Sequence, residues 1–232
     1  MDKLEFDRFL TGLDCDGALV ETRAAAETAL SRRSLVGASL AGASAILLGR
    51  ASSAAAAGGL PASDIGILNY ALVLEYLQAA FYTEAERNGA LKGKAAQAAT
   101  VVGAIEWAHV KAFRKLLGSQ AVKRPLFDFQ GTTEQQQAFL KTAVALEDLA
   151  VAAYKGQAPK LKSNAVLAAA VGIHSVEARH AAWMRGLFGI TPAVHAFDQP
   201  ASRAQVTRLV ASTKFIVSKP RVQGRGNPTF TG

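Results

Sequence analysis

Cysteine is almost absent from this chain of 232 residues, because Cys15 is the only one. A single thiol cannot close a disulfide within the chain, so a disulfide-stapled fold is excluded. A metal site built from several thiolates is excluded for the same reason. Any metal chemistry then falls to carboxylates and imidazoles, which suit Fe, Mn or Zn better than Cu(I) or iron–sulfur clusters.

Long runs of β-branched residues are also scarce, whereas apolar residues make up 50% of the chain and alanine is abundant. Alanine is the strongest helix former. The seven prolines and 20 glycines fall mostly at the ends of periodic stretches, which is where helices stop. The composition therefore predicts an all-α protein made of closely packed helices.

The first 57 residues have the pattern of a targeting segment. The paired arginines Arg32 and Arg33 precede a mildly apolar run from Leu35 to Leu48, and a stretch rich in alanine and serine follows it. This order is typical of a twin-arginine signal, with cleavage expected between Ser53 and Ala57. The alternatives are an amphipathic N-terminal helix and an uncleaved anchor. We expect a periplasmic or extracellular mature protein.

Acidic residues are few in residues 58–232, which hold 11 Asp and Glu against 20 Lys and Arg, a net charge of +9. The tail after Asp198 has six basic residues and no acidic one. Such a tail favours anionic partners, and export directs this expectation to an anionic envelope surface and away from nucleic acid. A merely solvated basic surface is the alternative.

Four long helices are expected in a bundle spanning residues 58–190, and residues 191–232 form a C-terminal extension. Capping and stop signals place the helices at 63–88, 94–117, 132–155 and 163–188, with a shorter helix at 202–212. Helices of about 25 residues are roughly 38 Å long. About 15 extended residues can span up to roughly 50 Å, so the connection at 119–132 can cross the whole bundle. The predicted fold is a four-helix bundle with one long crossover.

Six side chains on these helices form a candidate metal site. Glu106 and His109 are three residues apart, as are Glu177 and His180. A step of three turns a helix by about 300°, so each pair leaves one face. Single glutamates lie in the middle of the other two helices, at positions 75 and 147. Four glutamates and two histidines on four helices are the ligand set of a two-metal carboxylate site.

An internal repeat supports this set. The pattern L-E-x-L-x-x-A-x-Y occurs at 74–82 and again at 146–154, an offset of 72, and the two Glu–His pairs match at an offset of 71. The chain is thus two copies of a helix pair. We expect Glu106 and Glu177 to bridge two metals, Glu75 and His109 to complete one, and Glu147 and His180 the other. Two divalent cations would offset four buried carboxylates, whose desolvation is otherwise costly.

Other readings of these residues remain open. Each Glu–His pair could be an exposed pair that only supports its helix. Tyr82 and Tyr154 each lie seven residues after a predicted ligand glutamate, so they could donate hydrogen bonds there or relay electrons, and core filling is the alternative. Several other charged or polar side chains are expected at the surface or in structural roles: Glu84, Glu86, Asp148, His174, His195. Of these, Asp148 could steady a neighbouring helix.

Three stretches, Leu68 to Tyr82, Leu146 to Gly156 and Val176 to Ala182, resemble the ferritin-like domain family that includes the plant desiccation-related proteins and their exported bacterial relatives. The ending at 196–200 resembles that family as well. The resemblance implies a ferritin-like bundle, a di-iron or di-manganese centre and a link to stress or desiccation. It implies no defined reaction. Storage ferritins replace the second histidine, so a set with both resembles the members that react with oxygen or peroxide.

Three functions are compatible with these observations. The first is an exported two-metal oxidoreductase, a ferroxidase or a catalase-like protein that oxidises Fe(II) or consumes O₂ or peroxide. The second is a stress-protective structural protein in which metal only stabilises the bundle. The third is a binding protein whose basic tail targets anionic envelope polymers. A homodimer is the default expectation for the assembly.

Overall fold

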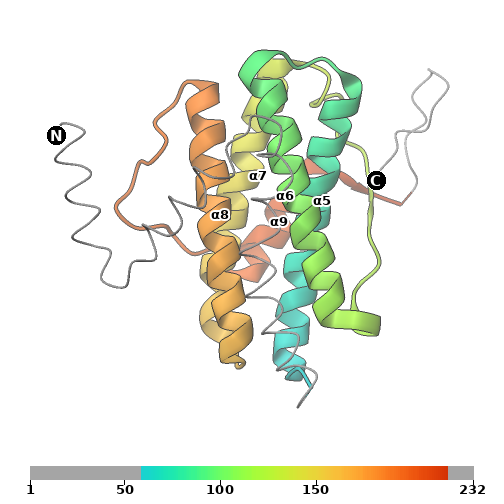
Figure 1. The fold of residues 1–232 in the computed structure, drawn as a ribbon, viewed down its shortest axis with the longest axis vertical. Helices are drawn as coiled ribbons and strands as arrows, with labels where there is room; N and C mark the ends of the chain where they lie inside the picture. Colours follow the sequence, from blue (N-terminus) through green and yellow to red (C-terminus); the bar gives the residue numbers. More distant parts are fainter. Residues whose placement is uncertain (1–58, 219–232) are drawn as a thin grey trace, which may run out of the picture. The chain divides into compact units, whose positions relative to one another are not determined.

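Four long helices lie side by side in the computed structural model, which describes residues 59–218 (Figure 1). They are α5 (Ala62–Asn88), α6 (Gly93–Leu117), α7 (Gln136–Gln157) and α8 (Asn164–Phe188). Helix α5 packs along α6, and α7 packs along α8, so each copy of the sequence repeat forms one helix pair. The all-α bundle is confirmed. The expected signal at 1–57 lies outside the described residues, as does the end of the tail.

The connection between α6 and α7 runs from one end of the bundle to the other, so that α7 starts at the end opposite to where α6 stops (Figure 1). It contains the short 3-10 helix η1 (Gly118–Gln120) and the strand β1 (Leu126–Phe127). Strand β1 pairs antiparallel with β2 (Ile216–Val217) near the end of the described chain. This pairing was not expected, because two residues are too short to show the alternation of a strand.

Local signals set several helix ends as expected. Helices α5 and α8 are followed by Gly89 and Gly189, which adopt left-handed conformations with φ of 63° and 85°. Ser163 precedes α8, and its side chain accepts a hydrogen bond from the backbone N–H of Val166. The helix α9 (Arg203–Thr213) begins with a capping box between Ser202 and Gln205.

Helix α7 differs from the expectation at both ends. It begins at Gln136, not at residue 132 or 133, because the Thr133 hydroxyl donates instead to the Glu84 carboxylate at 2.7 Å. It also continues through Gly156, which does not end it. A Cβ on Gly156 would lie 1.9 Å from the carbonyl oxygen of Ala201, so glycine permits the segment before α9 to approach α7 closely. That segment is held by a hydrogen bond from Ala201 N–H to the Ala152 carbonyl at 2.9 Å.

An aromatic cluster ties the crossover to the bundle. The rings of Phe81 in α5 and Phe139 in α7 stack at 5.2 Å, and Phe129 of the crossover meets Phe81 edge-on at 5.3 Å. Phe129 also contacts Phe215, just before β2. Helix α5 is long and apolar enough to cross a membrane by length and composition alone, but it is largely buried as a core helix of this bundle.

Candidate metal centre

The six residues expected to bind metal lie together in the interior of the bundle. Helix α5 contributes Glu75, α6 contributes Glu106 and His109, α7 contributes Glu147, and α8 contributes Glu177 and His180. All four glutamates are 0% exposed, and the two histidines are 1% and 3% exposed. The reading of the Glu–His pairs as exposed helix-surface pairs is therefore wrong. Their spacing of three places each pair on the face that the bundle buries.

One half of the cluster is centred on His109. Its Nδ1 atom lies 3.1 Å from Glu75 Oε2, 3.2 Å from Glu177 Oε1 and 3.5 Å from Glu106 Oε2. One potential ligand atom from each of these four residues lies within 4.8 Å of the others. This group, which we call the Glu75 half-site, could hold a metal ion.

The second half is centred on His180. Its Nδ1 atom lies 2.9 Å from Glu106 Oε1 and 3.7 Å from Glu147 Oε2. Together with Glu177, these residues form a second group, in which one potential ligand atom from each residue also lies within 4.8 Å of the others. We call it the Glu147 half-site. Glu106 and Glu177 belong to both groups, so the two half-sites share a pair of carboxylates.

Two buried tyrosines donate hydrogen bonds to the glutamates Glu75 and Glu147, each from the other copy of the repeat. The Tyr82 hydroxyl, on α5, donates to Glu147 Oε1 on α7 at 2.5 Å. The Tyr154 hydroxyl, on α7, donates to Glu75 Oε1 on α5. Each tyrosine therefore fills the core and also holds one oxygen of the glutamate that belongs to the other copy of the repeat.

Gln78 is a polar neighbour of the cluster that the sequence reasoning missed. It lies one turn after Glu75 on α5, is 2% exposed, and its Nε2 donates to Glu177 Oε2 at 3.3 Å. The spacing of three from Glu75 was the available signal, because it places Gln78 on the same helix face.

Burial and neighbouring charges strongly shift the pKa values of Glu75, Glu177 and His180. Burial raises the pKa of Glu75 to about 7 against the opposing effect of His109. Burial and the charge of Glu106 raise the pKa of Glu177 well above its usual range. Burial opposes charge on His180, but the neighbouring carboxylates Glu106 and Glu147 outweigh it and raise the pKa to about 11. Without a cation, the cluster must therefore hold protons.

Several buried polar atoms of the cluster have no hydrogen-bond partner among the described residues. They are both carboxylate oxygens of Glu106, Glu147 Oε2, Glu177 Oε1, His109 Nε2 and both ring nitrogens of His180. Buried polar atoms are rarely left unpartnered, because each costs about 1–3 kcal/mol. Oxygen and imidazole nitrogen atoms that face one another in a buried core are suitable ligands for Fe, Mn or Zn. The residues present therefore fit a metal centre.

The structure contradicts the expectation for one of the other charged or polar side chains, Glu84, and agrees with it for Glu86, Asp148, His174 and His195. Glu84 is buried, not a surface charge, since it accepts the hydrogen bond from Thr133. Asp148 holds α8 through a two-point contact with Arg185 at 2.9 and 3.0 Å. His174 approaches Asp198 at 3.9 Å and takes no part in either group. His195 is exposed beyond the bundle.

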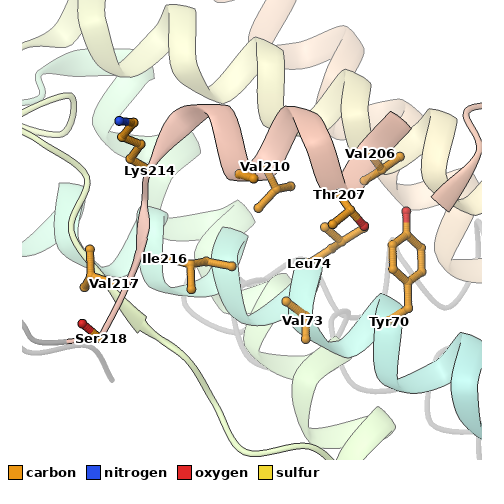
Figure 2. A pocket seen from close by; sticks show the side chains of 11 residues that line it. Tyr70, Val73, Leu74, Val206, Thr207, Val210, Lys214, Ile216, Val217 and Ser218 are labelled. Atoms are coloured by element: carbon orange, nitrogen blue, oxygen red, sulfur yellow. The ribbon is translucent and has the colours of Figure 1, made fainter. Parts of the chain in front are cut away.

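A separate apolar groove of about 780 Å³ lies between α5, α9 and β2 (Figure 2). Its apolar walls are formed by Val73, Leu74, Val206, Val210, Ile216 and Val217. Tyr70 stands at one end and Lys214 at the other (Figure 2). Since no carboxylate or histidine lines the groove, it is distinct from the buried cluster.

Comparison with known proteins gives one result that bears on this geometry. The family model described as the ferritin-like domain matches residues 63–189, which include all six clustered side chains. No curated protein matches the chain.

Proposed function

The chain belongs to the ferritin-like domain family, and on this basis we propose that it is a two-metal carboxylate oxidoreductase that oxidises Fe(II) or consumes O₂ or peroxide. The observation that carries the proposal is the pair of groups that share Glu106 and Glu177 in a fully buried core. Two divalent cations balance four carboxylates, which explains why the bundle tolerates so many acidic groups in its interior.

The protein's own residues would act by binding and orientation. Glu75 and His109 would hold one ion, Glu147 and His180 the other, and Glu106 and Glu177 both. When bound, two redox-active ions would supply the two electrons that reduce one peroxide to two waters, with uptake of two protons. Tyr82 and Tyr154 hold the outer oxygens of Glu147 and Glu75, which keeps the other oxygens directed into the cluster.

The setting we propose is outside the cytoplasm. The paired arginines and the small residues before position 58 support export of a folded, metal-loaded protein, and the basic tail supports contact with an anionic envelope surface. Protection against stress or desiccation is consistent with removal of Fe(II) and peroxide. A homodimer is our expectation for the assembly.

Elemental analysis tests the metal centre. We expect about two Fe or Mn ions per chain in protein purified from its own host, and a loss of both in a Glu106→Gln, Glu177→Gln double variant. Glu84→Gln is the matched control, because Glu84 is also a buried glutamate but lies outside both groups. Equal metal content in the wild type and the double variant would contradict the proposal.

Turnover assays separate the enzyme from a protein that metal only stabilises. The loaded wild type and the Glu84→Gln variant should oxidise Fe(II) or consume peroxide, and the double variant should not. Full metal content without turnover would favour the purely structural role.

A further inference from the structure

The two copies of the repeat differ at one position beside the metal cluster. Gln78 on α5 corresponds to Ala150 on α7 at the offset of 72. Both positions are buried, with each residue 2% exposed. Gln78 donates a hydrogen bond to Glu177 Oε2 at 3.3 Å, whereas the methyl group of Ala150 cannot donate one. The six proposed ligands are therefore the same in both copies of the repeat, but only the first copy has a glutamine that hydrogen-bonds to one of them.

This difference falls on the two shared carboxylates. Glu177 Oε1 lies 3.2 Å from His109 Nδ1, and the corresponding oxygen of Glu106 lies 2.9 Å from His180 Nδ1. Each shared glutamate thus directs one oxygen at the histidine of the opposite repeat. The second oxygen of Glu177 accepts the hydrogen bond from Gln78. The second oxygen of Glu106, Oε2, lies 3.5 Å from His109 Nδ1 and accepts no hydrogen bond from a side-chain amide within residues 59–218.

A hydrogen bond behind a ligand restricts the rotation of that ligand before metal arrives. Glu177 therefore has less freedom to lose when its Oε1 atom takes up an ion beside His109. Groups that hydrogen-bond to metal ligands in this way typically contribute about 10–100-fold to metal affinity.

We propose that Gln78 is a positioning residue that makes the two half-sites unequal, so that the Glu75 half-site takes up its ion first and more tightly. This inference rests on the proposed two-metal function and deepens it. It predicts ordered loading, in which one equivalent of metal gives mainly chains that are occupied at the Glu75 half-site alone. Two equal, independent half-sites would instead give a statistical mixture of empty, singly occupied and doubly occupied chains, with the single ion divided between the two half-sites.

Stepwise titration of metal-free protein with Mn(II), without oxygen, tests the order. We expect two separate steps in the wild type, the first at least about tenfold tighter, and a single-ion signal in electron paramagnetic resonance at one equivalent. Gln78→Met keeps the shape of the side chain and removes the donor. It should weaken the first step about 10–100-fold and change the second step less, although Glu177 is shared by both half-sites, so that the two steps merge.

Gln157→Met is the matched control, because Gln157 is also a buried glutamine of the bundle and belongs to neither group. It should leave both steps unchanged. Glu147→Gln identifies the order, since it should abolish the second step and spare the first.

The outcomes separate the two proposals. Two equal steps in the wild type, or unequal steps that Gln78→Met does not alter, would overturn the unequal half-sites and leave the two-metal function standing. Loss of the first step in Glu147→Gln would overturn the assigned order. Failure of the wild type to bind Mn(II) at all would overturn both proposals.

Discussion

The hydroxyls of Tyr82 and Tyr154 each donate a hydrogen bond to a glutamate of the other copy of the repeat, Glu147 and Glu75. Neither helix pair therefore supplies the tyrosine that bonds to its own glutamate. Tyr82→Phe and Tyr154→Phe each leave a buried carboxylate oxygen without its donor. Since that loss typically costs about 1–3 kcal/mol, we expect each variant to lower the free energy of unfolding of the metal-free protein by this amount. Urea unfolding in the presence of a chelator measures it.

Tyr70→Phe provides the control for both tyrosine variants. The Tyr70 hydroxyl is buried and has no hydrogen-bond partner among the described residues. Removing it should leave the free energy of unfolding unchanged or slightly higher. An equal loss in all three variants would mean that the loss does not come from the hydrogen bonds to Glu147 and Glu75.

Glu84 should make the stability of the fold depend on pH independently of the six clustered side chains. Burial raises its pKa, followed by the smaller opposing effect of the Thr133 hydrogen bond. A carboxyl with a raised pKa in the folded state stabilises fully below its unfolded value of 4.5, and that contribution is lost as the pH rises through the folded pKa. Glu84→Gln, which can still accept from Thr133, should therefore be more stable than the wild type at pH 7.

The difference between Glu84→Gln and the wild type should shrink as the pH is lowered towards 4.5. Urea unfolding at a series of pH values measures this trend. Glu86→Gln is the control two residues away, because Glu86 is exposed. A stability difference for Glu84→Gln that does not vary with pH would contradict the assignment of the effect to ionisation of Glu84.

At the scale of elements, Gly156 decides how the C-terminal segment meets α7. A Cβ there would lie 1.9 Å from the Ala201 carbonyl oxygen. Gly156→Ala should therefore displace the segment and break the hydrogen bond between Ala201 and Ala152, at a cost of about 1–3 kcal/mol as for other overpacked sites. Thermal unfolding measures the stability, and limited proteolysis at residues 190–202 reports release of the segment.

Gly186→Ala is the matched helix variant, because a Cβ on Gly186 meets nothing within 4 Å. Alanine is the better helix former by about 0.8–1.0 kcal/mol, so this variant should be neutral or stabilised. If Gly156→Ala behaved in the same way, the close approach of Ala201 would not matter for stability.

The elements that could be predicted from the sequence are those specified by local signals. Gly89, Gly189, Ser163 and Ser202 end or begin helices through contacts within a few residues of themselves. The start of α7 could not be predicted in this way, because the Thr133 hydroxyl bonds to Glu84, 49 residues away. A capping residue gives no sign that a distant partner competes for it.

In the candidate site, too, local patterns could be predicted from the sequence and long-range contacts could not. Spacing and the internal repeat predicted which glutamates and histidines share a helix face, and the structure places all six in one buried cluster. The role of Gln78 could not be predicted, because a single glutamine on an apolar helix face has many possible partners. Only the assembly of all four helices into one bundle brings Gln78 on α5 to Glu177 on α8.

At the scale of the whole molecule, the paired arginines should determine where the protein resides. A double variant, Arg32→Lys with Arg33→Lys, keeps the charge of the segment but removes the arginine pair that the twin-arginine pathway reads. We expect the full-length precursor to remain in the cytoplasm, while the wild type is exported and cleaved between Ser53 and Ala57. Cell fractionation and mass spectrometry of the mature N-terminus measure this.

Arg23→Lys is the control for export, because Arg23 lies in the same segment but outside the pair. It should be exported and cleaved as the wild type is. Equal export of the double variant would show that residues 1–57 do not act as a twin-arginine signal.

On the proposed function, metal removal should lower the stability of the entire bundle, since all four long helices contribute side chains to the one cluster that could hold metal. A ligand at 1,000 times its dissociation constant stabilises the folded state by about 4 kcal/mol. For a domain of this size, 1 kcal/mol shifts the midpoint of thermal unfolding by about 2–4 °C. Chelation should thus lower the midpoint by roughly 8–16 °C.

The Glu106→Gln, Glu177→Gln variant should not respond to the chelator, because it has no ion to lose. A chelator response of equal size in that variant would place the stabilising metal elsewhere in the chain, whereas no response in the wild type would mean that the folded bundle does not depend on metal.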